Sequence, residues 1–129
     1  MNTEKDDLRF SAKLLFQFRI EVGGDNGKRR LCEERIVTFH AKSGRAALAA
    51  AKCKGKQSEH IYENDAGNRV YFEFVGILEL LELGALFAAD EVWYDIKERL
   101  LPMERRDKLI PPEDQLCALL NEQARRNRR

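Results

Sequence analysis

The chain of 129 residues is long enough for one domain with a buried core. Its hydrophobic fraction of 43% is typical of a globular protein, and its charged fraction of 35% indicates a well-solvated surface. A formal net charge of +1 provides no overall electric field that would attract nucleic acid or an anionic membrane.

The N-terminal stretch and the cysteines bear on the compartment. MNTEKDDLRF is charged and lacks an apolar core, so we expect no signal peptide. No apolar run approaches the roughly 20 residues that are needed to cross a bilayer. Cys32, Cys53 and Cys117 are odd in number and form no CxxC pair, which favours reduced thiols over a disulfide scaffold. We therefore expect a cytoplasmic protein without a membrane segment.

The first half of the chain predicts a hairpin of two strands. Residues 1–8 are polar, and we expect them to be disordered. From Phe10 to Val22 apolar residues alternate with polar ones, which predicts a long strand with one buried face. The loop GGDNGKRR and a second strand at residues 31–41 follow, and two strands joined by such a loop pair antiparallel.

An alanine-rich helix is predicted next. Ser43 provides a cap for the segment GRAALAAAKCKG, which has strong helix propensity and ends at Lys54-Gly55. A narrow stripe that includes Ala47 and Ala51 can lie close against a sheet because its side chains are small.

Three further strands are predicted after the helix. EHIYENDAGNRVYFEF predicts a strand, a turn and a second strand that runs from Arg69 to about Leu83. The alternation of this strand stops after Val75, and Gly76 suits a β-bulge at the change. EVWYDIKERL alternates again and predicts a fifth strand.

The end of the chain predicts a linker and a helix. PMERRDKLIPP has few apolar residues, and its last prolines suit the first turn of a helix. Leu116, Leu119 and Leu120 form the apolar stripe of that helix. Residues 97–129 carry 9 Lys/Arg against 6 Asp/Glu, so this segment is a candidate for an acidic partner.

These elements predict an α+β fold with the order β-β-α-β-β-β plus a C-terminal helix. Because hairpins dominate, we expect a mainly antiparallel sheet with the first helix packed on one face. We assign residues 1–8 to a disordered N-terminus and residues 9–101 to a single α+β domain. Residues 102–129 form the linker and a C-terminal amphipathic helix with a basic end.

Four segments taken together resemble a known family. They are FSAKLLFQF, then EERIVTFHAKS with the alanine-rich helix after it, YENDAGNRVYFEFVGILEL, and EVWYDI. Their order and spacing are similar to those of the small bacterial proteins of the domain of unknown function 4288 family. The resemblance spans about residues 9–96 and implies one compact domain. It implies no activity and supplies no catalytic or binding residues.

The residues themselves give no signature of catalysis or of a metal. GxGxxG, GxxxxGK[ST], GxSxG and HExxH are all absent from the sequence. Cys32 and His40 would lie roughly 25 Å apart on an extended strand, too far to act as nucleophile and base. The spacing of Glu59, His60 and Glu63 would suit metal ligands on a helix, but the sequence around them predicts a strand and a turn. We therefore expect no catalytic residues, no metal and no cofactor, and the sequence leans against an enzyme.

Some polar residues are nevertheless candidates for ligand or partner binding: Glu33, Arg35, Tyr62 and Glu73. Glu33 and Arg35 share the face of Val37 on the second strand, where a carboxylate and a guanidinium can orient a ligand. The alternative is a cross-strand ion pair worth about 0.2–1 kcal/mol. The basic clusters lie in a loop, a linker and a terminus, which argues against nucleic-acid binding.

Two hypotheses about function remain open. The first is a non-enzymatic protein-interaction module, antitoxin-like or immunity-like in one version, that binds a protein partner or forms a homodimer. Its candidate partner surface is Ile77, Leu81, Leu116 and Leu120, and the C-terminal helix, or else a second subunit, would cover residues 77–81. The alternative is a small-molecule-binding or enzymatic domain with a polar pocket between helix and sheet, lined by the four polar candidates.

Overall fold

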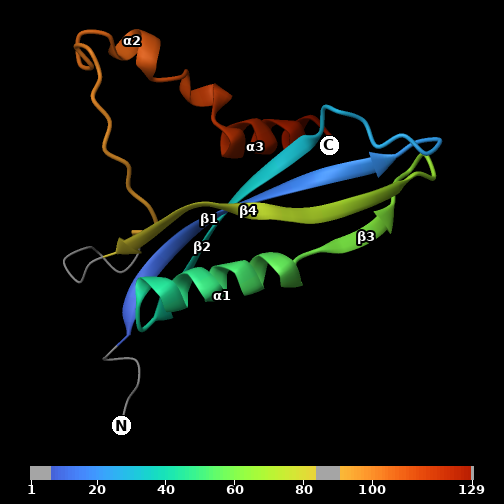
Figure 1. Ribbon diagram of the computed structural model, residues 1–129. Coiled ribbons are helices and arrows are strands. Elements are labelled where there is room, and N and C mark those ends of the chain that lie inside the picture. The colour runs from blue at the N-terminus through green and yellow to red at the C-terminus, as the bar shows by residue number, and fades with distance from the viewer. Residues whose placement is uncertain (1–6, 84–90, 129) are drawn as a thin grey trace. The chain divides into compact units, whose positions relative to one another are not determined.

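The computed structural model describes residues 7–83 and 91–128 of the chain (Figure 1). It has an α+β fold, in which a mainly antiparallel sheet carries a helix on one face, as the sequence predicts. The chain divides into two compact units, Met1–Tyr94 and Asp95–Arg129, and each is described by itself. The elements of the first unit are β1 Leu8–Glu21, β2 Leu31–Ala41, α1 Gly44–Gln57, β3 His60–Glu63 and β4 Arg69–Leu83.

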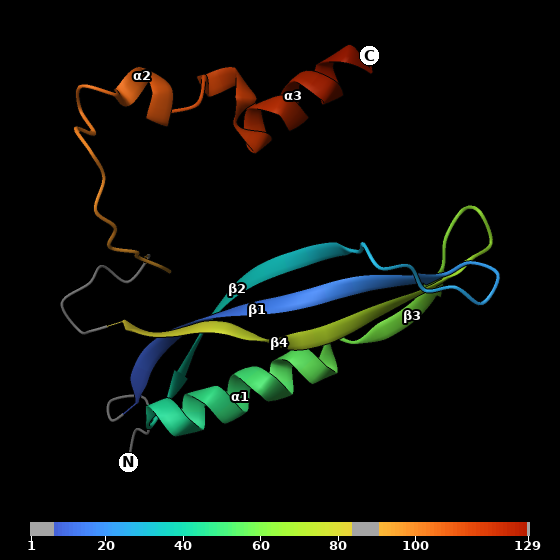
Figure 2. The same ribbon diagram turned by 45° about the horizontal axis from the view of Figure 1, so that its top comes forward.

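The four strands are ordered β2-β1-β4-β3, and each neighbouring pair is antiparallel. β1 and β2 pair without a shift from Leu8↔Ala41 to Phe18↔Leu31. Figure 2 shows β2 and β3 at opposite margins of the sheet, with β1 and β4 between them. The two long strands β1 and β4 therefore carry the core. β2 forms one edge of the sheet, and β3 together with residues 73–83 of β4 forms the other.

The core lies between the sheet and α1. We call the side of the sheet that carries Phe16 the helix face and the opposite side the outer face. On the helix face, the rings of Phe16 and Phe72 stack with their centroids 4.6 Å apart. Ala47 and Ala51 of α1 are fully buried, so the small stripe predicted from the sequence is the surface that packs on the sheet.

The ends of α1 differ in how well the sequence predicts them. The hydroxyl of Ser43 accepts a hydrogen bond from the backbone N–H of Ala46 at 3.1 Å, as expected for an N-cap. The predicted end at Gly55 is wrong, because the helix continues to Gln57. Gly55 is buried within the last turns, and a Cβ atom there would meet the ring of Phe74. This glycine therefore permits close packing and does not end the helix.

The break in alternation that the sequence shows in β4 is caused by two β-bulges. The register against β1 shifts twice, and each shift leaves one residue of β4 without an opposite partner on β1, first Val75 and then Leu78. Gly76, where one bulge was predicted, lies between the two. The shifts bring Ile77 and Leu80 to the helix face, where both pack against the core. The bulges thus explain why apolar residues occur in both alternating positions.

The predicted fifth strand is wrong for the described residues 91–99, which form no strand. The hydroxyl of Ser11 instead donates a hydrogen bond to the carbonyl of Val92, and the ammonium of Lys13 lies 5.3 Å from the ring centroid of Trp93. Ser11 and Lys13 both project from the outer face of β1. This segment therefore lies over a face of the sheet, and alternation alone does not distinguish such a segment from a paired strand.

The second unit contains short helices without a buried core. Its elements are α2 Arg106–Leu109, the 3₁₀ turn η2 Glu113–Gln115 and α3 Cys117–Asn127. α3 is the helix predicted from the sequence, whereas α2 lies within the predicted linker. No described residue of this unit whose exposure is given is buried. Among the described residues of both units, no helix is long and apolar enough to span a membrane.

The domain limits also differ from those expected. The division between the two units falls at Tyr94 and Asp95, whereas the sequence predicts one domain up to residue 101. β1 begins at Leu8, and residues 1–6 of the expected disordered N-terminus lie outside the described residues. The cover of residues 77–81 by the C-terminal helix stays a prediction.

Candidate functional site

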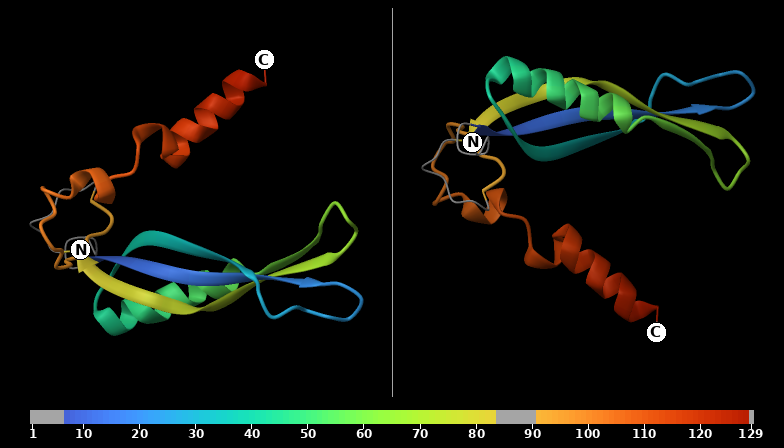
Figure 3. Two further views of the ribbon diagram at one scale, coloured as in Figure 1. Left: turned by 90° about the horizontal axis from the view of Figure 1, so that it is seen from above. Right: turned by 90° about the horizontal axis from the view of Figure 1, so that it is seen from below.

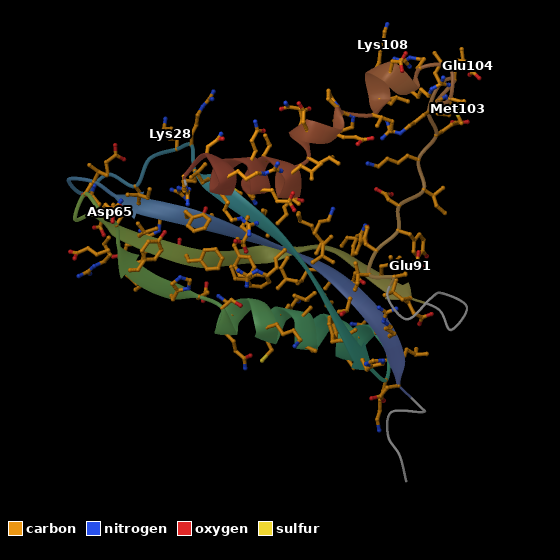
Figure 4. All side chains as sticks on the ribbon, turned by 180° about the vertical axis from the view of Figure 1, so that it is seen from behind. Lys28, Asp65, Glu91, Met103, Glu104 and Lys108 are labelled. Carbon is orange, nitrogen blue, oxygen red and sulfur yellow. The ribbon has the colours of Figure 1, made fainter. Side chains whose placement is uncertain are left out.

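α1 covers only part of the helix face. Figures 1 and 2 show that the strands continue past the C-terminal end of α1 toward their connecting turns. Figure 4 places Lys28 and Asp65, which lie in those two turns, at the same end of the sheet. Glu33, Arg35 and Tyr62 all lie on the helix face, and their register positions place them near or beyond the end of α1. The structure thus brings these predicted residues onto one surface.

Arg35 lies over two aromatic rings of this surface, those of Phe16 and Phe72. Its guanidinium carbon is 4.9 Å from the ring centroid of Phe16 and 5.6 Å from that of Phe72. Its Nε and Nη2 atoms lie 2.7 and 2.6 Å from Oε2 of Glu33. The ion pair is therefore formed within one strand, between residues two apart, and not across strands. It holds the guanidinium over the rings, a favourable cation–π arrangement.

The row of aromatic rings continues to β3 through His60, which the sequence analysis did not assign to this surface. His60 lies with its ring centroid 5.0 Å from Phe72 and 5.8 Å from Tyr62. The Nδ1 atom of His60 is 2.9 Å from the carbonyl oxygen of Ser58. The i, i+2 spacing of His60 and Tyr62 on a strand was the signal that both share a face.

The acidic and histidine residues near β3 do not form a metal site. A carboxylate oxygen of Glu59 accepts a hydrogen bond from the backbone N–H of Phe74 at 3.0 Å. His60 lies on the helix face, and Glu63 on the outer face. Among the residues that the structure describes, no group of three or more His, Cys, Asp and Glu side chains could hold a metal ion.

Glu73 is separated from the other predicted site residues because it lies on the outer face. Oε1 of Glu73 accepts hydrogen bonds from Nε of Arg19 and Nε2 of Gln17, each at 2.9 Å. Oε2 accepts a third from Nη2 of Arg19 at 3.1 Å. The expectation that Glu73 would line a pocket between helix and sheet is therefore wrong, since β4 turns this side chain away from α1.

Arg19 and Glu73 belong to a longer polar network on the outer face. Arg19 also donates to Oδ1 of Asn26 at 2.7 Å, and its guanidinium lies 4.0 Å from the ring centroid of Tyr71. The hydroxyl of Tyr71 donates to a carboxylate oxygen of Glu21 at 2.9 Å. The hydrogen bonds from Arg19 lower the pKa of Glu73, and the same contact raises the pKa of Arg19. This network joins β1 to β4 and stabilises the ionised form of Glu73.

A hollow of about 390 Å³ lies beside the loop that joins β1 and β2. Phe18, Ile20 and Leu31 provide apolar walls, and Arg29 and Arg30 provide basic ones. None of the residues predicted from the sequence lines it.

The edge of β2 that faces away from β1, which we call its outer edge, is long and, among the described residues, unpaired. Within the described part of the chain, β2 pairs with β1 on one side and with nothing on the other. The strand has 11 residues, from Leu31 to Ala41. At the opposite edge β3 has 4 residues and pairs with residues 69–72 of β4, while residues 73–83 of β4 lack a described strand on that side and are interrupted by the two bulges. Apolar side chains of β2 are exposed, with 43% of Ile36 and 75% of Leu31 accessible.

The predicted apolar partner surface is only partly open. Ile77 and Leu81 are half-buried, and Ile77 packs against the core. Leu116 and Leu120 of the second unit are 47% and 43% exposed. Their role as a partner surface stays a prediction.

Comparison with known proteins identifies one family. A family model described as domain of unknown function DUF4288 matches residues 9–93. A search of the curated proteins and a search of the solved structures found no match. The matched residues include the whole four-stranded sheet from its second residue, α1, and the segment over the outer face. The chain therefore belongs to the DUF4288 family.

Proposed function

We propose that the protein is a non-enzymatic protein-interaction module that binds its partner through the outer edge of β2. The observation that carries this proposal is the 11-residue edge strand, which pairs on one side only within the described residues. In an antiparallel strand, alternate residues direct their backbone N–H and C=O groups to each side. An extended segment of another chain can add to such a row of free groups.

The two edges of the sheet differ in a way that favours β2 as the binding edge. Proteins protect exposed edges by short strands, prolines, lysines or bulges. The opposite edge is protected in two ways: β3 has only 4 residues, and residues 73–83 of β4, which β3 does not reach, carry the two bulges. β2 is long, contains no proline or lysine, and keeps one register along β1. The charges of Glu33 and Arg35 on β2 are paired with each other and present no net repulsion to an incoming strand.

The polar network of the outer face supports a non-catalytic function. A carboxylate with a shifted pKa is a common sign of an active site. The pKa shift of Glu73 has a structural cause, however, since Arg19 and Gln17 together donate three hydrogen bonds to it.

One version of the proposed function is neutralisation of a partner, as by an antitoxin-like or immunity-like protein. Free, exposed Cys32 and Cys53 support a cytoplasmic location.

A second candidate function is the binding of a small molecule on the helix face. It is favoured by the guanidinium of Arg35 above Phe16 and Phe72, and by the ring of His60, which lies between Phe72 and the exposed ring of Tyr62. Such a surface suits a planar anionic ligand, which can stack on a ring and pair with a guanidinium. An increase in melting temperature with a small aromatic carboxylate that is abolished by Arg35→Lys would support this candidate.

The test of the proposed function is capture by a tagged chain from the cells that produce it. The double variant Ile36→Lys/Thr38→Lys places two lysines on β2, and Ile61→Lys is the matched control on β3, where Ile61 is 59% exposed. We expect one stoichiometric protein to be captured by the wild type and by Ile61→Lys. The double variant should retain at most roughly a tenth of it, since two lysines at an edge oppose strand addition.

Circular dichroism of each variant shows whether the fold is preserved. Equal capture by the wild type and the folded double variant would contradict the proposal. A chain that captures no protein but gains thermal stability from a small aromatic carboxylate would favour the second candidate.

A further inference from the structure

The β2 edge has the features of a strand that pairs with a second copy of itself. We propose that two chains join their β2 strands antiparallel about a two-fold axis at Ile36, so that one continuous sheet runs through both. This inference rests on the proposed function because it uses the same edge and names its partner. The partner is identical, so each side of the interface must be complementary to itself.

Symmetry limits which residues can face one another. A two-fold axis perpendicular to the sheet keeps the helix face of both copies on the same side. Residues of the helix face therefore oppose residues of the helix face, and the axis passes midway between one residue and its own copy, which face each other. With Ile36 at the axis, Arg35 faces Val37 of the second copy, and Glu34 faces Thr38. This register overlaps all 11 residues of β2.

Charge and exposure favour this register over its neighbours. An axis at Glu34 would oppose two carboxylates, and an axis at Arg35 would oppose two guanidinium groups, both of which destabilise a strand pair. An axis at Val37 would leave Leu31, which is 75% exposed, without a partner. The axis at Ile36 opposes no like charges directly and covers both Leu31 and the 43% exposed Ile36.

The surroundings of the edge allow a second copy to approach. Figure 3 shows α1 toward the β4 side of the sheet, with β2 at the far margin. The outer-face residues of β2 are exposed, including Cys32, Glu34 and Thr38. The formal net charge of +1 gives little long-range repulsion between copies.

Disulfide cross-linking tests both the pairing and its register. The native thiols are first removed by Cys32→Ser, Cys53→Ser and Cys117→Ser. Ile36→Cys then places a thiol at the axis, where facing Cα atoms in an antiparallel pair are about 4.5–5.5 Å apart and can be bridged. Thr38→Cys is the matched control, because its two copies would be roughly 13 Å apart along the strand, beyond the reach of a disulfide.

We expect mild oxidation to give covalent dimers of the Ile36→Cys chain and none of the Thr38→Cys chain. Light scattering of the wild type should show a dimer, and Ile36→Lys should raise its dissociation constant by on the order of tenfold or more, since two lysines would then face each other. Ile61→Lys should leave the dissociation constant unchanged.

Three results would overturn the inference: a monomeric wild type at every concentration, equal cross-linking at residues 36 and 38, or a dimer that Ile36→Lys leaves intact. A monomeric chain whose captured protein is lost on Ile36→Lys/Thr38→Lys would overturn the self-pairing alone. The proposed function fails separately, when the edge variants change neither self-association nor capture.

Discussion

Gly55 of α1 lies so close to Phe74 of β4 that a Cβ atom on the glycine would be 2.5 Å from two carbons of the phenyl ring. Real Cβ atoms do not approach other atoms so closely, and the ring is held by its packing against Phe16. The contact sets how near the last turns of α1 lie to the sheet.

Gly55→Ala should therefore lower the free energy of unfolding by about 1–3 kcal/mol, because the added methyl group must displace the ring or the helix. Gly44→Ala is the control, since a Cβ atom at Gly44 has nothing within 4 Å. The control should change the free energy of unfolding by less than about 0.5 kcal/mol. Urea denaturation measures both, and equal values for the two variants would show that the close contact is not a constraint.

Glu73 should make stability depend on pH. Its pKa is lowered in the folded chain by hydrogen bonds from Arg19, so its contribution is complete above the ordinary glutamate pKa of about 4.3 and is lost as the pH falls through the lower folded value. At pH 7, Glu73→Gln should cost about 1 kcal/mol. The difference from the wild type should shrink below pH 4.

Urea denaturation at a series of pH values measures this dependence. Glu34→Gln is the control, because Glu34 is an exposed carboxylate on the same face. A difference between wild type and Glu73→Gln that stays constant from neutral to acidic pH would argue against the ion pair.

Arg35 should stabilise the fold through its planar guanidinium and not through its charge alone. Arg35→Lys keeps the charge but loses the contact of the guanidinium with the rings of Phe16 and Phe72, and should lower the free energy of unfolding by about 0.5–1 kcal/mol. Arg29→Lys, in the exposed loop between β1 and β2, should have no measurable effect. The contact over the rings would be unsupported if the two variants had the same urea midpoint.

Residues 1–94 should fold without the second unit. Every residue of the core cluster lies between Ala12 and Leu80, and the family model ends at residue 93. A chain truncated after Tyr94 should unfold cooperatively, with a free energy of unfolding within about 0.5 kcal/mol of the full chain. A larger loss, or a loss of cooperativity, would instead support the prediction that α3 covers residues 77–81.

The strands and α1 were largely predictable because their patterns are local. Arg69 and Leu83 were predicted as the limits of β4, and the structure confirms both. The bulges were predictable only in part, since Gly76 marked the region while Val75 and Leu78 carry the irregularities. A register shift depends on the opposing strand, which a single segment does not specify.

The candidate site was less predictable because it depends on which strands are neighbours. Because side chains alternate along β4, Glu73 lies on the face of the sheet opposite to Phe72, and Phe72 lies in the core. A pocket that combined Glu73 with Arg35 therefore conflicted with the alternation of β4 itself. The open edge of β2 could not be recognised before the order β2-β1-β4-β3 was known.

Hydrogen exchange of the β2 amides tests the central claim most directly, namely that the outer edge of β2 is where the protein binds. The rates should be measured for the dilute chain, the concentrated chain, and the chain with its captured protein bound. We predict that every second amide from Leu31 to Ala41 exchanges fast in the dilute chain and becomes protected in one of the other two states. Outward-facing amides that exchange equally fast in all three states would contradict the account.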